Sequence, residues 1–335
     1  MPSRPGGLRR VALLLALALS AAAGSAGCGG SDESRTTTVS FAGVRDQGAT
    51  GYAVAELEGL FAQQGLRFSP TWATSGTVIM QGLVSGDFDV AGLGPAQLFA
   101  AIGNGACARV LRPVQGATYG VIAQAGLHLD TTRPYPEVLT QLRGKAVGVA
   151  ARGASQELVL RSLLTTAGLN PDTDIRWVAI GGGATAVSAF ASGQVDAAMS
   201  YPQLEVNLEA RGTAFDKLLD LAGPDTPLGQ FWQSVAVANC DWADDHPGTV
   251  LKFCHALNQA FTALKQQPDA GPAGFAHLGL GPDPGQARKL WDRYRTLVVD
   301  IPALTEENWR HQAAFTPDRT TPDFSEYVVD GCSTA

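Results

Sequence analysis

Two arginines stand directly after short apolar runs and could bind an anion. Arg45 follows "SFAGV" and Arg152 follows "VGVAA", and neither turn contains another cation. A guanidinium can pair with a planar or tetrahedral anion through two parallel hydrogen bonds. Each arginine also has a structural interpretation, because Arg45 can pair with neighbouring Asp46 and Arg152 can lie in water at the edge of a cleft. We therefore treat both as candidates for anion binding, and we expect Arg152→Ala to lower the affinity for an anionic ligand at least tenfold.

A second group of candidates lies at the starts of predicted helices. Ser75, Gly76 and Thr77 open one helix, and Ser155 and Gln156 open another after "GVAARGA". Unpaired backbone N–H groups at a helix start favour an anion, and hydroxyls there either cap the helix or bond a ligand oxygen. Both interpretations stay open for these residues.

Signatures of catalysis and of metal binding are not found in the sequence. The five histidines have no metal-ligand spacing, and neither a G-x-S-x-G elbow nor a P-loop occurs. "GLGPAQ" and "GGGATA" each lack the last glycine of a dinucleotide fingerprint. We therefore expect a protein that is not an enzyme and that holds no cofactor and no metal. The histidines are His128, His246, His255, His277 and His311.

One phrase occurs twice and indicates where these candidates are positioned. "SGDFDVAGLGPAQ" starts at residue 85 and "SGQVDAAMSYPQ" at residue 192, so Ser-Gly-x-x-Asp-x-Ala is repeated with Pro ten residues after the Ser. In each copy Ser-Gly ends a helix, Asp leads into a strand, and Pro opens the next helix. Gly94 precedes Pro95 in the first copy and Tyr201 precedes the Pro in the second. Tyr201 is the aromatic side chain best placed to stack on a ligand.

The elements around the two copies alternate between strand and helix. Short apolar runs bounded by turn residues indicate strands, and apolar residues at a spacing near 3.6 indicate helices. This alternation favours crossover connections and mostly parallel sheets, and two passes of it predict two sheets. The first pass predicts strands at 37–44, 66–73 and 88–93 and helices at 51–65, 76–84 and 95–103. The second pass predicts strands at 145–151, 174–180 and 195–200, helices at 154–168 and 184–193, and a further helix from Pro202.

From about Asp241 to the end the sequence is helical, with amphipathic runs at 248–266, 284–297 and 304–315 and no evident strand. The segments 110–126 and 229–239 stand where the chain would leave a first lobe and return to it. Two crossings form a hinge, and we expect Tyr119 and Trp232 to pack there. Trp72 and Trp177 are expected in the core.

Four segments together resemble the solute-binding proteins of ABC importers, and more narrowly the nitrate, sulfonate and taurine receptor group that includes binders of thiamine pyrimidine precursors. The resemblance runs from about Val39 to the C-terminal "SEYVVD". The segments are "AELEGLFAQQGLRFSP", "GLVSGDFDVAGLGPAQ", "LRGKAVGVAARGASQELVLRSLLTTAGL" and "FASGQVDAAMSYP".

The resemblance implies an α/β, two-lobed periplasmic-binding-protein fold of type II with two crossovers, whose helical C-terminal region packs on the first lobe. It divides the chain into a signal peptide at 1–27, a lipidated Cys with a flexible tether at 28–37, a first lobe at 38–118 and 231–335, and a second lobe at 119–230. In this family the ligand contacts the turns at the carboxyl ends of the strands. Carried onto this sequence, these turns supply Arg45, Asp46, Ser75, Gly76, Thr77, Gly94, Pro95, Arg152, Gly153, Ser155, Gln156 and Tyr201.

The implied function is to close on a small solute and deliver it to a permease with its ATPase. A small anion of the sulfonate or nitrate kind is the first candidate ligand, and a neutral heteroaromatic such as a pyrimidine precursor is the second. Two other functions stay open. Enzymes on this fold that make the thiamine pyrimidine use a Cys-rich motif, and this sequence contains no such Cys cluster; a lipoprotein of this kind could also sense a ligand without transporting it. We expect a monomer.

The N-terminus reads as an export signal. Arg4, Arg9 and Arg10 precede the apolar run 11–23, which is shorter than the roughly 18 to 20 residues that span a bilayer. "SAGC" resembles a lipobox, so Cys28 is either the site of lipidation, which would attach the protein to the membrane by lipid alone, or an ordinary residue of a secreted protein. The polar stretch that follows is a flexible tether.

Charge and cysteine content limit the partners and the compartment. The chain has 24 basic and 31 acidic side chains, and because residues 1–27 hold three Arg and no acid, the exported part has a net charge of −10. This charge argues against nucleic acid and anionic lipid headgroups as partners. In an oxidising compartment four cysteines permit two disulfides with three pairings, while buried free thiols are the alternative. These cysteines are Cys107, Cys240, Cys254 and Cys332.

Overall fold

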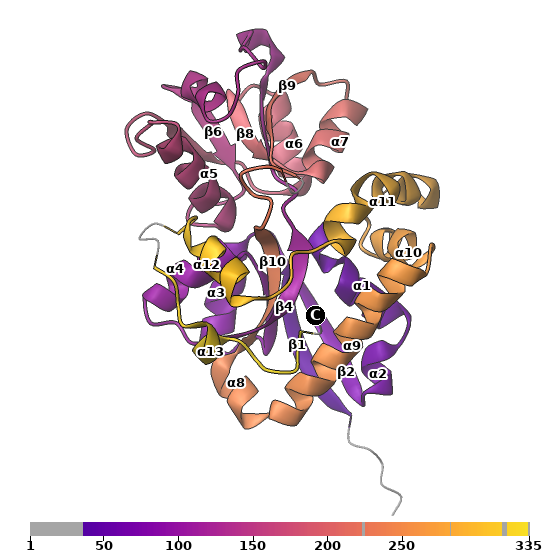
Figure 1. The fold of residues 1–335 in the computed structure, drawn as a ribbon. Helices are drawn as coiled ribbons and strands as arrows, with labels where there is room; N and C mark the ends of the chain where they lie inside the picture. Colours follow the sequence, from indigo (N-terminus) through magenta and orange to yellow (C-terminus); the bar gives the residue numbers. More distant parts are fainter. Residues whose placement is uncertain (1–35, 223–224, 282, 317–319, 334–335) are drawn as a thin grey trace, which may run out of the picture. The chain divides into compact units, whose positions relative to one another are not determined.

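A computed structural model describes residues 36–222, 225–281, 283–316 and 320–333. These ranges form two five-stranded sheets with helices packed on them (Figure 1). The predicted signal peptide, Cys28 and nearly all of the tether lie outside the described residues. The predicted two-lobed α/β architecture is confirmed.

The first sheet has the strand order β2-β1-β3-β10-β4. β1 pairs in parallel with both β2 and β3, while β10 runs antiparallel to both β3 and β4. The strands are β1 (Thr37–Val44), β2 (Leu66–Ala73), β3 (Val90–Leu93), β4 (Ala108–Gly116) and β10 (Trp232–Asn239).

The second sheet repeats this arrangement with the order β7-β6-β8-β5-β9. β6 pairs in parallel with β7 and β8, and β5 runs antiparallel to β8 and β9. The strands are β5 (Gly120–Gln124), β6 (Ala146–Val149), β7 (Arg176–Ala179), β8 (Ala197–Ser200) and β9 (Phe215–Asp220).

Each sheet contains one strand of opposite direction, which the expectation of mostly parallel sheets did not specify. The reversed strands are β10 and β5, and each is the strand by which the chain enters its lobe from the other one. Parallel strands of both lobes end at the hinge side, so a strand that starts at the hinge must run the other way. The carboxyl ends of the parallel strands therefore border the space between the lobes.

The helices of the first lobe show one difference from the sequence prediction. The helix expected at 51–65 is divided into α1 (Thr50–Leu57) and α2 (Leu60–Gln63) because Gly59 adopts the left-handed conformation with φ 66°. Such a φ interrupts the helical hydrogen-bond ladder, and glycine tolerates it without steric cost. The division turns Leu60 and Phe61 into the core. The other helices of this pass are α3 (Gly76–Ser85) and α4 (Pro95–Gly103), and a short 3-10 helix covers Gln47–Ala49.

The second lobe carries three α-helices on its sheet in the described residues. Two short 3-10 helices, Ala125–Leu127 and Glu137–Leu142, connect β5 to β6. The α-helices are α5 (Ser155–Thr166), α6 (Gly183–Ala191) and α7 (Pro202–Ala210).

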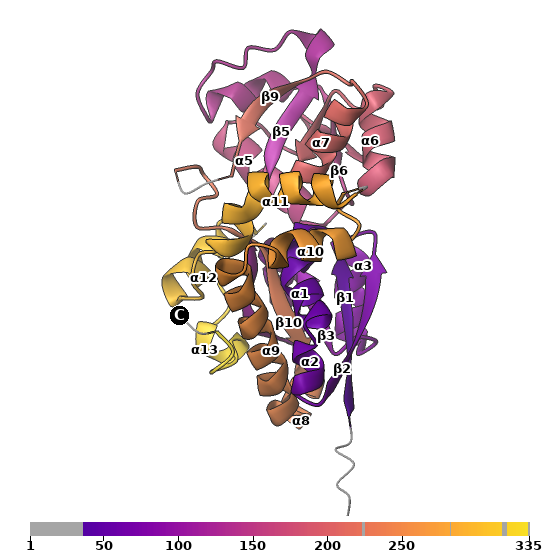
Figure 2. The ribbon, with the colours of Figure 1, turned by 90° about the vertical axis from the view of Figure 1, so that its right-hand side faces the viewer.

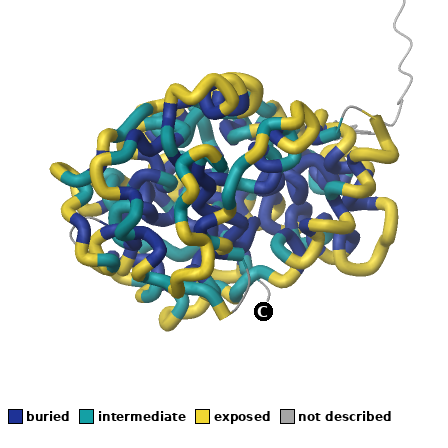
Figure 3. The backbone as a smooth tube through the Cα atoms, turned by 90° about the horizontal axis from the view of Figure 1, so that it is seen from above, coloured by how far each residue is buried: buried dark blue, intermediate teal, exposed yellow. Residues whose placement is uncertain are grey.

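The repeated phrase has the same structural role in both lobes. Asp89 Oδ2 accepts a hydrogen bond from Ser40 N at 2.7 Å, and Asp196 Oδ2 accepts one from Ala146 N at the same distance. Each Asp thus joins the turn after a helix to the central parallel strand of its own sheet. Buried segments, dark blue in Figure 3, lie mostly inside the molecule, and exposed segments, yellow, lie mostly at its edge.

The C-terminal region is helical and packs mostly on the first lobe. α9 lies against α1 and α2, and α12 lies against α4. The region also reaches the second lobe, because α11 lies next to α7 (Figure 2). There, Nη1 of Arg293 on α11 lies 3.5 Å from Oε2 of Glu209 on α7. The helices are α8 (Cys240–Asp245), α9 (Pro247–Gln266), α10 (Ala270–His277), α11 (Pro284–Val299), α12 (Glu306–Ala313) and α13 (Phe324–Tyr327).

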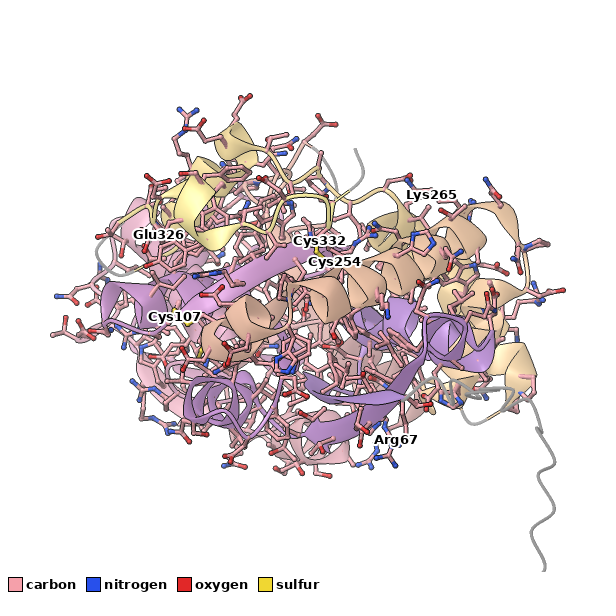
Figure 4. All side chains as sticks on the ribbon, turned by 90° about the horizontal axis from the view of Figure 1, so that it is seen from below. Arg67, Cys107, Cys254, Lys265, Glu326 and Cys332 are labelled. Atoms are coloured by element: carbon pink, nitrogen blue, oxygen red, sulfur yellow. A yellow bond between two sulfur atoms is a disulfide. The ribbon has the colours of Figure 1, made fainter. Side chains whose placement is uncertain are left out.

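Two disulfides hold the first lobe and its C-terminal region together. Of the three pairings that the sequence left open, the structure has Cys107–Cys240 and Cys254–Cys332. The second disulfide joins α9 to the C-terminal segment (Figure 4). Both bonds lie on the first-lobe side, so neither crosses the hinge.

Candidate functional site

A cavity of about 250 Å³ lies between the carboxyl ends of the parallel strands of the two lobes. Residues of both lobes and of both hinge connections line it, which is the arrangement expected for a ligand site in open α/β sheets. The first lobe contributes, among others, Arg45, Asp46, Gly48, Tyr52, Ser75, Gly76, Gly94, Gln97 and Gln115. The second lobe and the hinge contribute Tyr119, Ala154, Ser155, Gln156, Gly182, Gly183, Tyr201, Gln203, Gln233 and Ser234.

Asp46 is the acidic group of this cavity. It follows β1 and caps the 3-10 helix Gln47–Ala49, because Oδ1 accepts a hydrogen bond from Gly48 N at 2.9 Å. Burial raises the pKa of Asp46 to about 6, although hydrogen bonds from Gly48 N and Ala49 N act in the opposite direction. A carboxylate has about four acceptor positions, and this cap uses two at most. The remaining acceptor capacity is available to a ligand in the cavity, which Asp46 lines.

Two tyrosines lie near this carboxyl group. Burial, and after it the charge of Asp46, raises the pKa of Tyr119. Burial also raises the pKa of Tyr201, while the hydrogen bond from Gly183 N acts against this and the charge of Asp46 adds to it. Both phenols therefore stay protonated at neutral pH and can donate or accept a hydrogen bond. The cavity thus combines the Asp46 carboxyl group with two neutral phenols.

Arg45 lines the cavity but is exposed. Its guanidinium carbon lies 5.4 Å from the centre of the Trp72 ring, a cation–π contact. The ion pairs found in the described part of the chain do not include one between Arg45 and Asp46. Arg45 therefore adds a positive charge at the mouth of the cavity and not at its floor.

Four of the sequence candidates do not line the cavity. Arg152 Nε and Gly153 N each donate a hydrogen bond to Glu157 Oε2 at 2.8 Å, and about half of the Arg152 side chain is exposed. Thr77 Oγ1 donates to the backbone carbonyl of Arg152 at 3.4 Å, and Pro95 forms the first residue of α4. The structure thus places Arg152 and Gly153 in an ion-paired turn beside the cavity.

One hydrogen bond across the cavity joins the two lobes at the repeated phrase. Ser155 Oγ, at the start of α5, accepts a hydrogen bond from Gln97 N in the first turn of α4 at 3.2 Å. Gly94 makes this approach possible, because a Cβ at Gly94 would lie 2.5 Å from Ser155 Cβ and would overlap its hydroxyl. In the second lobe, the Tyr201 hydroxyl accepts a hydrogen bond from Gly183 N at 3.2 Å. Two of the helix starts at the cavity are therefore occupied by hydroxyls of the protein itself.

Sequence reasoning missed most of the polar lining of the cavity. Gln97 and Gln203 lie in the first turns of α4 and α7 and end the two quoted copies of the phrase, so the repeat itself was a signal for them. Gln115 and Gln233 lie beside the hinge, where the sequence has no comparable signal. Tyr119, which was assigned to hinge packing, is buried there and also lines the cavity.

In the described residues, no three His, Cys, Asp or Glu side chains gather in a way that could hold a metal ion. A search of the same residues finds no helix that is both long and apolar enough to span a membrane.

Comparison with known proteins identifies the family of this chain and proteins of similar fold. The model of the NMT1-like family matches residues 32–273. The chain belongs to the NMT1-like family. This family match supports the predicted group, and the neighbours below confirm the predicted fold. This NMT1-like chain is also 33% identical over 151 residues to a protein of Brucella abortus (strain 2308) that is named as a binding protein. The match covers 45% of this chain and 43% of that relative, so it spans less than half of each.

Solved structures share the fold of this NMT1-like protein over most of the chain. A protein of Bordetella bronchiseptica RB50 has a TM-score of 0.75 at 22% identity, covering 89% of this chain and 96% of its own. The alkanesulfonate-binding protein of Xanthomonas axonopodis pv. citri has a TM-score of 0.67 at 19% identity, with coverages of 88% and 98%. The nitrate-binding protein of Synechocystis PCC 6803 has a TM-score of 0.63 at 14% identity, with coverages of 84% and 80%.

Proposed function

We propose that this protein is the extracytoplasmic solute receptor of an ABC importer. Family membership, the two-lobed fold and a cavity lined by both lobes support this function. Contacts to both lobes are available together only when the lobes close, so a ligand shifts the population toward the closed form. The closed form is then the species that the permease and its ATPase recognise, and lipid on Cys28 keeps the receptor at the membrane.

The proposed ligand is a small neutral heteroaromatic compound with N–H groups, such as a pyrimidine precursor. The observation that carries this choice is Asp46, a half-buried carboxyl group that lines the cavity and has a pKa of about 6. At neutral pH such a group is mostly ionised, so a ligand N–H that donates a hydrogen bond to it stabilises the complex, whereas an anion is repelled. Tyr119 and Tyr201 offer aromatic rings beside it.

A small oxoanion is the second candidate ligand. The starts of α3 and α5 border the cavity without a side-chain cap, and backbone N–H groups there favour an anion. The sulfonate-binding and nitrate-binding proteins among the structural neighbours point the same way. Against this candidate stand the charge of Asp46 and the two helix starts that Ser155 and Tyr201 occupy.

A thermal-shift screen of the purified exported part at pH 8 tests the proposal. The panel contains nitrate, bicarbonate, taurine, ethanesulfonate, riboflavin and two pyrimidines of the same shape, 4-amino-2-methylpyrimidine and 2,4-dimethylpyrimidine. We expect the aminopyrimidine to raise the melting temperature and its dimethyl analogue to raise it much less. If only the anions raise it, the proposed ligand class is wrong. Mass spectrometry of the same mixtures should show no product, and a product formed in stoichiometric excess would make the protein an enzyme.

A further inference from the structure

Three polar side chains form a hydrogen-bonded relay that joins the cavity to both hinge connections. Gln115 lies near the end of β4, Thr118 lies in the first connection between the lobes, and Gln233 lies at the start of β10, just after the second connection. Gln115 Nε2 donates to Thr118 Oγ1 at 3.1 Å. Gln233 Oε1 accepts from Thr118 N at 2.7 Å and from Thr118 Oγ1 at 2.9 Å. All three residues are buried.

The relay has only one possible direction. A backbone N–H can only donate, so the atom of Gln233 that meets Thr118 N must be the amide oxygen. The Thr118 hydroxyl has one proton, and its contact with that oxygen requires the proton to point there. The hydroxyl must therefore accept from Gln115, which presents its NH₂ group. The amide orientation of Gln115 is thus fixed, with Oε1 directed away from the relay.

The oxygen left over is a buried acceptor beside Asp46. Gln115 Oε1 has no hydrogen-bond partner in the described ranges, and Gln115 lines the cavity. A Cβ placed on Gly48 would lie 2.5 Å from this oxygen and 3.2 Å from Asp46 Oδ1. Gln115 Oε1 therefore occupies the space that a side chain at Gly48 would take, next to Asp46 Oδ1. A buried acceptor without a partner costs free energy, about 1–3 kcal/mol, which a ligand can recover.

We propose that Gln115 Oε1 accepts a hydrogen bond from the ligand next to Asp46, and that the Thr118–Gln233 relay holds it in that orientation. Gln115 is then a specificity-determining residue that selects ligands with N–H donors. Because the relay includes both hinge connections, a change of hinge geometry would disturb the acceptor, and binding is coupled to closure through it. This inference rests on the proposed function and adds to it the residue that recognises the N–H donor of the ligand.

Titration calorimetry at pH 8 with 4-amino-2-methylpyrimidine and 2,4-dimethylpyrimidine tests the proposal. The second probe has a methyl group where the first has its amino donor. Gln115→Met should lower the affinity for the aminopyrimidine at least tenfold and change that for the dimethyl analogue by less than threefold. Thr118→Val, which frees the amide to turn, should give a smaller loss with the same selectivity. Gln81→Met, an exposed position on α3, is the matched control and should change neither affinity.

Three outcomes decide between this inference and the proposed function. If the wild type binds the aminopyrimidine and Gln115→Met binds it equally well, the inference is wrong while the proposed function stands. An equal loss for both probes would show that Gln115 supports the fold and not the recognition of a donor. If the wild type binds neither pyrimidine, the proposed ligand class fails and the inference fails with it. Should Gln115→Met not fold, the selectivity of Thr118→Val decides in the same way.

Discussion

The two copies of Ser-Gly-x-x-Asp-x-Ala occupy equivalent places in the two lobes and differ at the residue that precedes the Pro. In both, a left-handed Gly ends the preceding helix, Asp bonds the central strand, and Pro begins the helix at the cavity. Gly94 precedes that helix in the first lobe and Tyr201 in the second. The helix start after Gly94 receives Ser155 from the opposite lobe, while Tyr201 bonds Gly183 N within its own lobe.

Because of this difference, the two lobes contribute different polar groups to the cavity. The first lobe supplies the acceptors Asp46 and Gln115. The second lobe supplies the hydroxyls of Ser155 and Tyr201, which accept hydrogen bonds at the starts of α4 and α6. The two lobes thus have similar folds but place different polar groups in the cavity.

Gly94→Ala should have the largest effect on binding, because Gly94 is the residue that lets Ser155 of the second lobe approach the start of α4. The backbone of Gly94 has φ −76° and accepts alanine, but the added Cβ would overlap the Ser155 hydroxyl. Overpacking of this kind costs about 1–3 kcal/mol. We expect roughly 100-fold weaker binding of 4-amino-2-methylpyrimidine by calorimetry, because the overlap opposes the contact between the two lobes.

The double variant Gly94→Ala with Ser155→Gly is the control for this prediction. Removing the hydroxymethyl group of Ser155 removes the overlap, so most of the affinity should return. Equal affinities for the wild type and Gly94→Ala would mean that this contact between the lobes is not part of the bound state.

Asp46→Asn removes the acidic group that the first lobe supplies, and its effect can be measured on the stability of the ligand-free protein. The folded-state pKa of about 6 lies above the ordinary 3.8, so the wild type loses stability as the pH rises from about 4 to about 6. Asparagine caps a helix start nearly as well as aspartate and carries no charge. Ligand-free Asp46→Asn should therefore be more stable than the wild type at pH 8, by about 1–3 kcal/mol, and equal to it at pH 4. Scanning calorimetry at the two pH values measures this; a variant less stable at pH 8 would contradict it.

Tyr201→Phe removes only the hydroxyl that accepts the hydrogen bond from Gly183 N. The hydrogen bond to Gly183 N is lost while the ring stays, which costs about 1 kcal/mol. We expect roughly fivefold weaker binding of the aminopyrimidine in a titration, and Tyr201→Leu to lose more because the ring is also lost. Equal losses in the two variants would exclude stacking on Tyr201.

Arg152→Ala should have the smallest effect on binding. The sequence predicted at least a tenfold loss for an anionic ligand, but the structure pairs Arg152 with Glu157 outside the cavity. An ion pair with an exposed partner contributes about 0–1 kcal/mol to the free energy of unfolding. We expect less than a twofold change in affinity for either the aminopyrimidine or ethanesulfonate. A tenfold loss for ethanesulfonate alone would support the oxoanion candidate.

The fold could be predicted from the sequence because its signals are local. Apolar runs, helix-ending glycines and Pro at helix starts mark most elements within a few residues. The division at Gly59 and the reversed strands β5 and β10 could not, because they depend on how the core accepts a turn and on where the chain enters each lobe.

The lining of the cavity was predictable where it coincides with strand ends, as for Asp46, Ser75, Gly94, Ser155 and Tyr201, while their contact with a ligand stays a prediction. Residues placed by long-range contacts were not. Whether Arg152 faces a ligand or Glu157 depends on a side-chain orientation that no spacing encodes. The acceptor role of Gln115 depends on a relay between residues that lie 118 positions apart at their extremes.

The affinity of 4-amino-2-methylpyrimidine for the wild type and for Asp46→Asn at pH 8 tests the central claim most directly. A hydrogen bond to an ionised group contributes about 1.5–3 kcal/mol, so Asp46→Asn should bind roughly 10 to 100 times more weakly. Unchanged or tighter binding by Asp46→Asn, or tighter binding of ethanesulfonate than of the aminopyrimidine by the wild type, would contradict the account.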